Sequence, residues 1–226
     1  MEDLFDSLCP LTEERIRIYN NKIITDSHHP FSGIPIPKVR KKVRQLSREE
    51  FHGYLRRATF FEEVFLTGLC AASAKLPLGE RLELLEAYFP LMDSWAFTDA
   101  VAPALAISAE EREEGWQAAL TYLQRPEAYD QRFGMIMLMK FYHGAQINQL
   151  IIHHLLPVSD GHYYVSMAKA WLLAEMAVTD FAAVQSLLES GKLDVKTHNR
   201  TIRKIIESFR IAPEDKLAAK ALKRKV

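Results

Sequence analysis

Four residues of the chain have the types and the spacing to act on one ligand: Trp95, Asp99, Arg132 and Trp171. Trp95 and Asp99 are four residues apart, so on a helix an indole and a carboxylate share one face. Arg132 follows Trp95 after 37 residues and Trp171 follows Arg132 after 39 residues. These intervals approach the roughly 40 to 47 residues of stacked HEAT-type helical pairs, so the side chains are expected on one side of the stack.

Together, these side chains supply two aromatic plates, one carboxylate and one guanidinium. This combination suits a sugar-phosphate ligand, because aromatic faces pack on a deoxyribose, an arginine binds a phosphate and a carboxylate faces positive charge. Taken singly, each tryptophan fits a core position better, as is expected for Trp116, and an aspartate one turn after a tryptophan is usually a solvated helix residue. The recurrence at the repeat period is what favours a site.

Other chemistries have little support in the sequence. The adjacent pairs His28-His29 and His153-His154 have diverging side chains and no HExxH arrangement, so neither a metal site nor a cofactor is predicted. There is no GxSxG elbow for a serine hydrolase. The two cysteines, Cys9 and Cys70, form no CxxC pair and are interpreted as small hydrophobic residues.

The elements that must position these residues are helices, because apolar residues recur with helical period and no stretch alternates with period two. Helices are expected over 11–25, 60–72, 80–89, 94–103, 110–123, 130–142, 147–156, 163–177, 181–190, 197–209 and 214–224. The prediction is an all-α, right-handed solenoid of HEAT-like repeats, with about a dozen helices and a concave basic face. A compact helical bundle is the structural alternative. Residues 1–226 are expected to form one domain, with 1–10 and 212–226 as terminal extensions.

Local signals place several helix ends. Ser47 and Glu50 have the spacing of a capping box. Either Asp93 or Ser94 can cap the helix that carries Trp95. The proline-rich loop 27–37 breaks the helical pattern, and Pro37 suits the first turn of a helix through Leu46.

Charge is balanced overall but segregated along the chain. The formal net charge is zero, while basic residues crowd the segments 38–48 and 192–210. A neutral chain can therefore still present a basic face. No apolar run approaches the length of a membrane span, and the start of the chain is acidic, so a cytoplasmic protein is expected. We expect it to be monomeric and to make no membrane contact.

The chain resembles the AlkD-like DNA alkylation repair proteins, the alkylpurine DNA glycosylases built of HEAT-like repeats. The similarity covers roughly residues 15 to 210 and depends on the order and spacing of several segments. These are FSGIPIPKVR at 31–40, WAFTD at 95–99, QRF at 131–133, YYVSMAKAW at 163–171 and the basic helix around Arg200 and Arg203.

The resemblance implies hydrolysis of the N-glycosidic bond of ring-alkylated, cationic purines in duplex DNA, with no cofactor. Asp99 would be the catalytic carboxylate, and Trp95 and Trp171 would cradle the deoxyribose of the lesion. Arg132 would contact the DNA backbone nearby. Further DNA contacts are expected from the basic residues of both segments, namely Lys38, Arg40, Lys41, Arg200 and Arg203.

Two alternatives stay open at this point. One is a non-catalytic HEAT-repeat module that binds DNA; it is motivated by two departures from the family pattern, Ser94 in place of an aromatic and Ala174 in place of a basic residue. The other is a protein scaffold, motivated by the zero net charge and by how often α-solenoids bind proteins.

Overall fold

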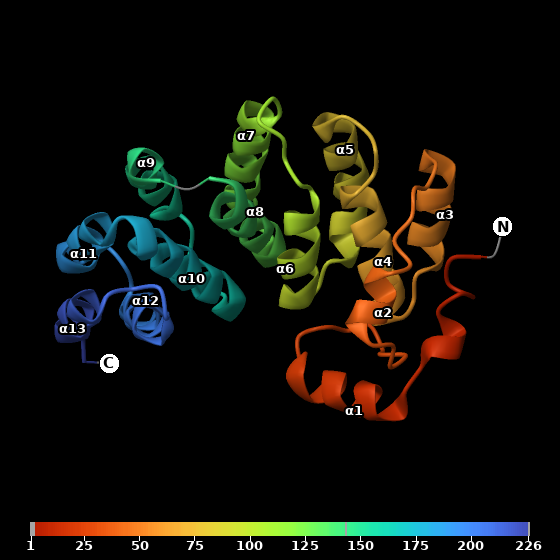
Figure 1. The fold of residues 1–226 in the computed structure, drawn as a ribbon, viewed down its shortest axis with the longest axis horizontal. Coiled ribbons are helices and arrows are strands. Elements are labelled where there is room, and N and C mark those ends of the chain that lie inside the picture. The colour runs from red at the N-terminus through yellow and green to blue at the C-terminus, as the bar shows by residue number, and fades with distance from the viewer. Residues whose placement is uncertain (1–2, 143, 226) are drawn as a thin grey trace. The chain divides into compact units, whose positions relative to one another are not determined.

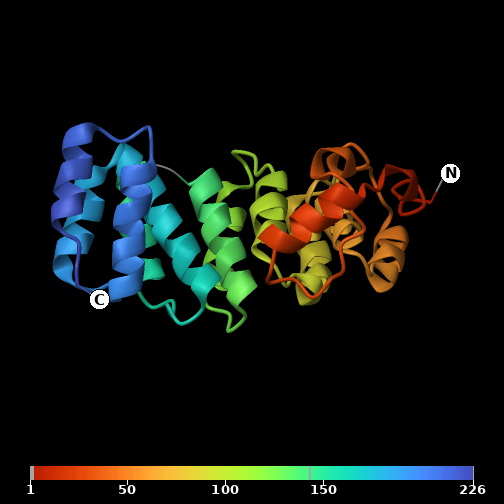
Figure 2. The ribbon, with the colours of Figure 1, turned by 90° about the horizontal axis from the view of Figure 1, so that it is seen from below.

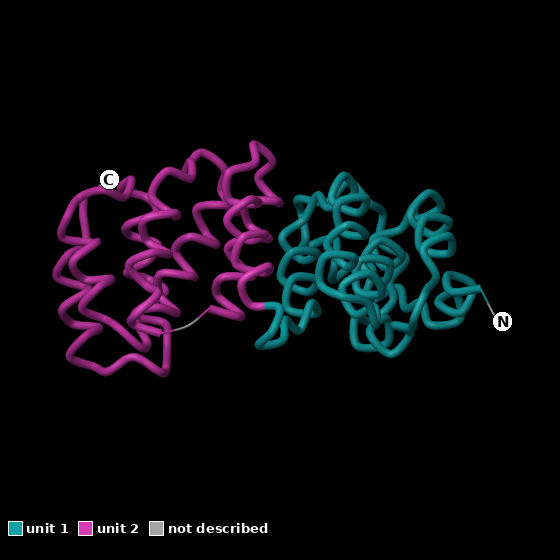
Figure 3. The backbone as a smooth tube through the Cα atoms, turned by 90° about the horizontal axis from the view of Figure 1, so that it is seen from above, with its two compact units in different colours: residues 1–111 teal, residues 112–226 magenta. Residues whose placement is uncertain are grey.

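The computed structural model describes residues 3–142 and 144–225, which form thirteen α-helices, two short 3-10 helices and no strand (Figure 1). The all-α prediction is thereby confirmed. The chain forms two compact units, residues 1–111 and 112–226 (Figure 3). The expectation of a single domain over residues 1–226 stays a prediction.

The first unit contains two 3-10 helices and six α-helices joined by short loops. They are η1 (Cys9–Leu11), α1 (Glu14–Ile23), α2 (Ile36–Arg40), α3 (Arg48–Arg57), α4 (Phe61–Ala72), α5 (Leu78–Tyr88), η2 (Phe89–Leu91) and α6 (Trp95–Ala104). The predicted capping box is confirmed at the start of α3, where the Ser47 hydroxyl accepts from the Glu50 amide and the Glu50 carboxylate accepts from the Ser47 amide.

Helix α4 is the centre of the first unit, since it packs against α2, α3, α5 and α6. Its sequence is almost wholly apolar, so nearly every position can be buried. Phe61 stacks on Phe97 of α6 with ring centroids 4.5 Å apart. A Cβ at Gly68 would lie 2.5 Å from the Tyr88 ring, so glycine lets α5 approach α4 closely. These contacts fix α6 against the core.

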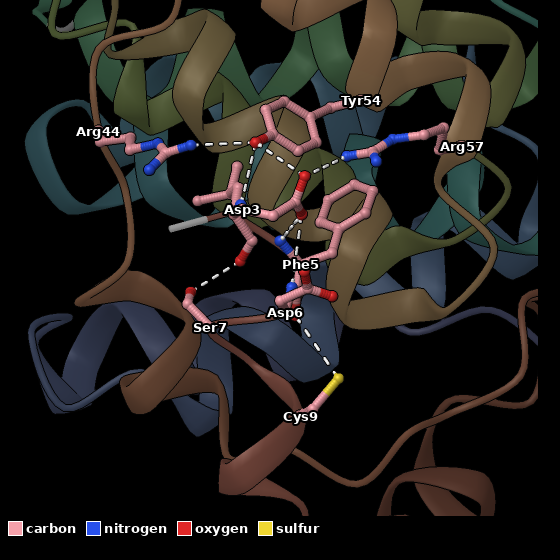
Figure 4. Close-up of polar contacts among 9 residues, drawn as sticks. Asp3, Phe5, Asp6, Ser7, Cys9, Arg44, Tyr54 and Arg57 are labelled. Carbon is pink, nitrogen blue, oxygen red and sulfur yellow. Dashed lines mark hydrogen bonds and ion pairs between the residues drawn. The ribbon is translucent and has the colours of Figure 1, made fainter. Parts of the chain in front are cut away.

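The first described residues pack onto α3 (Figure 4). The Tyr54 hydroxyl accepts a hydrogen bond from the Leu4 amide at 3.0 Å, and the Asp3 carboxylate lies 2.8 Å from Arg57. The Arg57 guanidinium also lies over the ring of Phe5, 5.5 Å from its centroid. The amino-terminal segment that we expected as an extension therefore contributes to the core of the first unit.

The second unit contains seven α-helices. They are α7 (Arg112–Leu123), α8 (Ala128–Phe141), α9 (Ala145–Leu155), α10 (Tyr163–Thr179), α11 (Phe181–Ser190), α12 (Val195–Glu207) and α13 (Pro213–Ala221). Helices α8, α10 and α12 pack side by side in one layer, while α9 contacts both α7 and α11 in a second layer (Figures 1 and 2). This two-layer stacking of helical pairs is compatible with a helical-repeat solenoid.

Close packing within this unit again depends on a small residue. A Cβ at Gly134 of α8 would lie 2.7 Å from the Ala119 carbonyl oxygen of α7. Trp116 is buried, as expected, with its ring 5.2 Å from that of Tyr142. The carboxyl-terminal segment is also packed, because α13 lies against α12.

One predicted helix is wrong beyond its first turns. The helix expected to run from Pro37 to Leu46 ends at Arg40. Val39 is the single buried residue of α2, so there is no apolar stripe to extend it. The basic residues that follow would also repel one another on a continued helix.

Candidate functional site

Helix α6 carries Trp95 and Asp99, and its start is tightly defined. Of the two predicted caps, Asp93 and Ser94, the structure has Ser94 as the N-cap. Its hydroxyl accepts a hydrogen bond from the Ala96 amide at 3.3 Å. Ser94 is fully buried. Trp95 and Asp99 are partly exposed on the first turns of the helix, where an indole and a carboxylate one turn apart can both reach a ligand.

Thr98 links the two residues from the buried side of α6. Its hydroxyl oxygen lies 2.8 Å from the Trp95 carbonyl oxygen and 3.0 Å from Oδ1 of Asp99. The single hydroxyl hydrogen is shared between these two acceptors. Because Thr98 is fully buried, this contact restrains the Asp99 carboxylate relative to the helix backbone.

A reciprocal clamp joins the start of α6 to the loop that follows α1. The Asp26 carboxylate accepts from the Ser94 hydroxyl at 2.9 Å and from the Trp95 amide at 3.0 Å. In return, the Asp93 carboxylate accepts from the Ser27 hydroxyl at 2.8 Å and from the next backbone amide at 2.6 Å. Asp26 adds a second acceptor to the helix N-terminus, where negative charge is favoured by the dipole.

A buried carboxylate holds the next part of the same loop. Glu62 is fully buried, and its two oxygens accept from the backbone amides of Ser32, Gly33 and Ile34 at 2.9, 2.9 and 3.1 Å. Gly33 has φ +93°, and a Cβ there would lie 2.6 Å from the Glu13 carbonyl oxygen. Only glycine fits this position without strain.

The basic residues predicted near this loop have different surroundings. Lys38 is ion-paired with Glu13 at 2.8 Å. The Arg40 guanidinium lies 5.5 Å from the ring centroid of Phe65, a cation–π contact. Lys41 follows α2 and is exposed. All three cations therefore lie at or near the surface of the first unit.

Arg132 lies on α8 in the second unit and is only 5% exposed. Its Nη1 donates to the Tyr164 carbonyl oxygen of α10 at 2.8 Å. In this arrangement Arg132 ties α8 to the start of α10. A phosphate contact from Arg132 stays a prediction.

Trp171 lies on α10 and is 37% exposed. Two residues before it, Lys169 is fully buried, with Nζ 2.8 Å from the Asp160 carboxylate and 2.5 Å from the Val158 carbonyl oxygen. Burial raises the pKa of Asp160, although the Lys169 ammonium opposes that shift. This ion pair anchors the loop before α10 to the middle of the helix that presents Trp171.

Arg200 and Arg203 lie on α12 and line a surface groove beside α10. The Arg200 guanidinium is 4.7 Å from the ring centroid of Tyr163, and its Nη1 donates to the Ser166 hydroxyl. Arg203 is exposed. Both arginines are therefore positioned on a surface that also offers an aromatic ring.

The predicted site residues thus fall into two groups. Trp95 and Asp99 share α6 in the first unit, whereas Arg132 and Trp171 belong to the second. Sequence reasoning did not identify Asp26, Glu62 or Lys169 as residues that position the site. An acidic residue within the apolar run of α4 is a signal that could have drawn attention to Glu62, since a buried carboxylate needs several donors.

Two further features of the described residues bear on function. Among residues 3–142 and 144–225, no cluster of three or more His, Cys, Asp or Glu side chains has the arrangement to hold a metal ion. In the same part of the chain, none of the helices combines the length and hydrophobicity that crossing a bilayer requires.

The model of a family described as DNA alkylation repair enzyme matches residues 11–207. No curated protein and no solved structure shows significant similarity to the chain. The matched range covers most of the sequence and includes both α6 and α10. The chain therefore belongs to the DNA alkylation repair enzyme family, and its substrate is DNA.

Proposed function

We propose that the protein is a DNA glycosylase that hydrolyses the N-glycosidic bond of ring-alkylated purines in duplex DNA. The observation that carries this proposal is the Trp95 and Asp99 pair on α6, an accessible indole and carboxylate one turn apart, with the carboxylate restrained by buried Thr98. The clamp by Asp26 adds support, because it defines the first turn that presents both side chains.

The chemistry suits a fixed carboxylate. A purine alkylated on a ring nitrogen is cationic, so it leaves as a neutral base with the electron pair of the glycosidic bond. The sugar then carries positive charge at C1′. Asp99 would stabilise that charge electrostatically and orient the attacking water, whose oxygen bonds to C1′ while its proton passes to the carboxylate or to solvent.

The electrostatic contribution of one such carboxylate is large enough to change the reaction rate measurably. Removing one preorganised electrostatic contact of this kind typically costs about 3 to 4 kcal/mol, or about 10² to 10³ in rate. The indole of Trp95, which shares α6 with Asp99, would add attraction between its face and the cationic sugar. Surface cations such as Lys41 and Arg203 would hold phosphates in a salt-dependent, sequence-independent manner.

The test is release of methylated purine from methylated duplex DNA, detected by chromatography of the free bases. Asp99→Asn keeps the shape of the side chain but removes its charge, so base release should fall about 10²- to 10³-fold. Binding to undamaged duplex should change little, because Asp99 makes no phosphate contact in this mechanism. Asp215→Asn, in the first turn of α13, is the matched control and should behave as wild type.

Equal base release by the wild type and Asp99→Asn would contradict the catalytic role of this carboxylate. Duplex binding with no base release by the wild-type protein at any concentration would instead favour a non-catalytic DNA-binding module. The departure at Ser94 does not by itself argue for that alternative, since a buried serine caps the helix there and leaves Trp95 accessible.

A further inference from the structure

Two adjoining cavities follow the surface between α10 and α12 in the second unit, where these helices pack side by side (Figure 2). The first has a volume of about 420 Å³ and the second about 320 Å³. Lys204 and Glu207 line both cavities, so the two form one continuous groove. We call this the α10–α12 groove.

One wall of the α10–α12 groove is aromatic and apolar. Tyr163, Met167 and Trp171 lie at four-residue intervals on α10, so their side chains share one face of the helix. Tyr163 is 55% exposed and Trp171 is 37% exposed. From Tyr163 to Trp171 the helix rises about 12 Å, the length of three to four nucleotide steps along one duplex strand.

The opposite wall is basic. Lys196, Arg200, Arg203 and Lys204 of α12 line the first cavity on one face of that helix, and Glu207 is the single acidic residue among the lining side chains there. This excess of positive charge favours a polyanion. Cations along one wall and aromatic faces along the other are the arrangement by which proteins hold a nucleic-acid strand.

Phe209 ends the groove beside Trp171. It follows the last turn of α12, it lines the second cavity, and its side chain is wholly exposed. A phenylalanine ring left in water loses the free energy that burial of its apolar surface would provide, so a wholly exposed ring next to an exposed indole indicates a binding partner. The neighbouring Arg210 is ion-paired with Glu175 of α10 across the same cavity.

We propose that Phe209 is a DNA-binding residue. One DNA strand lies along the α10–α12 groove with its phosphates on the cations of α12, and the ring of Phe209 stacks on the nucleobase face that an abasic position in that strand exposes. That this DNA is the substrate of base excision rests on the proposed function. The stacking by Phe209 requires only that the groove binds DNA.

The experiment compares Phe209→Ala with the wild type for binding to duplex DNA that contains a stable abasic-site analogue, measured by fluorescence anisotropy. Loss of one stacked base should weaken binding about five- to hundred-fold. Phe209→Tyr retains an aromatic face and should bind as the wild type does. Leu217→Ala removes another exposed apolar side chain, 68% exposed on α13 and outside both cavities, and should have no effect.

A second measurement locates the stacked base. 2-Aminopurine placed next to the abasic analogue should change its fluorescence when the wild-type protein binds, and this change should be lost with Phe209→Ala. Because the Phe209 side chain is wholly exposed, the variant is expected to fold normally. Binding by Phe209→Ala that equals the wild type, or that weakens no more than Leu217→Ala, would overturn the proposal and would instead favour a protein partner for this ring.

The same assays separate this proposal from the proposed function. If the wild type releases methylpurine while Phe209→Ala binds normally, the role of Phe209 fails and the glycosylase activity stands. If the wild type releases no base while Phe209→Ala loses binding, the groove is a DNA site and the glycosylase activity fails.

Discussion

At the scale of single residues, three backbone amides of the loop before α2 converge on the buried carboxylate of Glu62. Hydrogen bonds to a charged acceptor are stronger than neutral ones, and a buried charge is tolerated only when it is fully paired. Glu62 therefore determines the path of the FSGIP segment that contributed to the family resemblance.

Glu62→Gln replaces one carboxylate oxygen with an amide nitrogen, which faces a backbone N–H and cannot accept its hydrogen bond. We expect a loss of about 2 to 3 kcal/mol in the free energy of opening of this loop. Hydrogen exchange should accelerate about 30- to 150-fold at the amides of Ser32, Gly33 and Ile34. Glu49→Gln, an exposed carboxylate in the first turn of α3, is the control and should leave these amides protected.

At the scale of elements, α6 depends on a partner segment for its exact first turn. The clamp between Asp26 and the Ser94–Trp95 backbone joins a loop and a helix almost 70 residues apart in sequence. The short proline-rich loop cannot form a regular structure of its own, so these hydrogen bonds and those of Glu62 provide its order. The loop in turn restrains the helix that carries Asp99.

Asp26→Ala should release this restraint while leaving the helix content unchanged by circular dichroism. If Asp99 is catalytic, a small displacement of α6 should lower base release about 10- to 100-fold, because catalysis depends steeply on position. Asp180→Ala removes the equivalent cap of α11, where the carboxylate accepts from the Ala183 amide at 3.1 Å, and should leave base release unchanged. An equal loss of base release in both variants would indicate a general loss of stability and would contradict a specific displacement of α6.

At the scale of the whole molecule, zero net charge coexists with a strongly basic groove on α12.

The free energy of unfolding of the whole molecule is expected to depend on pH through one buried histidine. His198 is buried on α12, its Nε2 lies 2.8 Å from the Leu222 carbonyl oxygen, and burial lowers its pKa below the ordinary value. A neutral ring donates from Nε2 to that carbonyl and leaves Nδ1 uncharged in the interior.

The lowered pKa of His198 determines whether the free energy of unfolding rises or falls with pH. Above about pH 6.5 the ring is neutral in both the folded and the unfolded chain, so it adds no pH dependence there. As the pH falls below that value, the unfolded state binds a proton before the folded state does, and the free energy of unfolding decreases.

His198→Gln should therefore flatten the pH dependence of the free energy of unfolding below about pH 6.5, measured by urea unfolding at each pH. The variant keeps a side-chain donor that can reach the Leu222 carbonyl, although its absolute stability is expected to fall. His153→Gln, an exposed histidine on α9, should retain the wild-type slope. A slope in His198→Gln as steep as that of the wild type would contradict the assignment to His198.

Contacts between residues close in the sequence specify most of the helices and their caps. The helical period of apolar residues, the Ser47 cap and the four-residue interval from Trp95 to Asp99 depend on neighbours within a few residues, so they were predicted and observed. The cap of α6 was predicted as either Asp93 or Ser94, and the structure has Ser94. The helix through Leu46 was wrong because its persistence required apolar contacts that the basic segment does not make.

Which polar side chains are buried depends on contacts between helices that are distant in sequence. Arg132 was predicted from its spacing but lies in the interior against Tyr164, and Glu62, Asp26 and Lys169 acquire their roles from partners distant in sequence. Phe209 looked like the last apolar residue of a helix, yet α12 ends before it and leaves its ring exposed beside Trp171. Burial and exposure depend on how separate helices pack, and periodicity within one helix does not specify that packing.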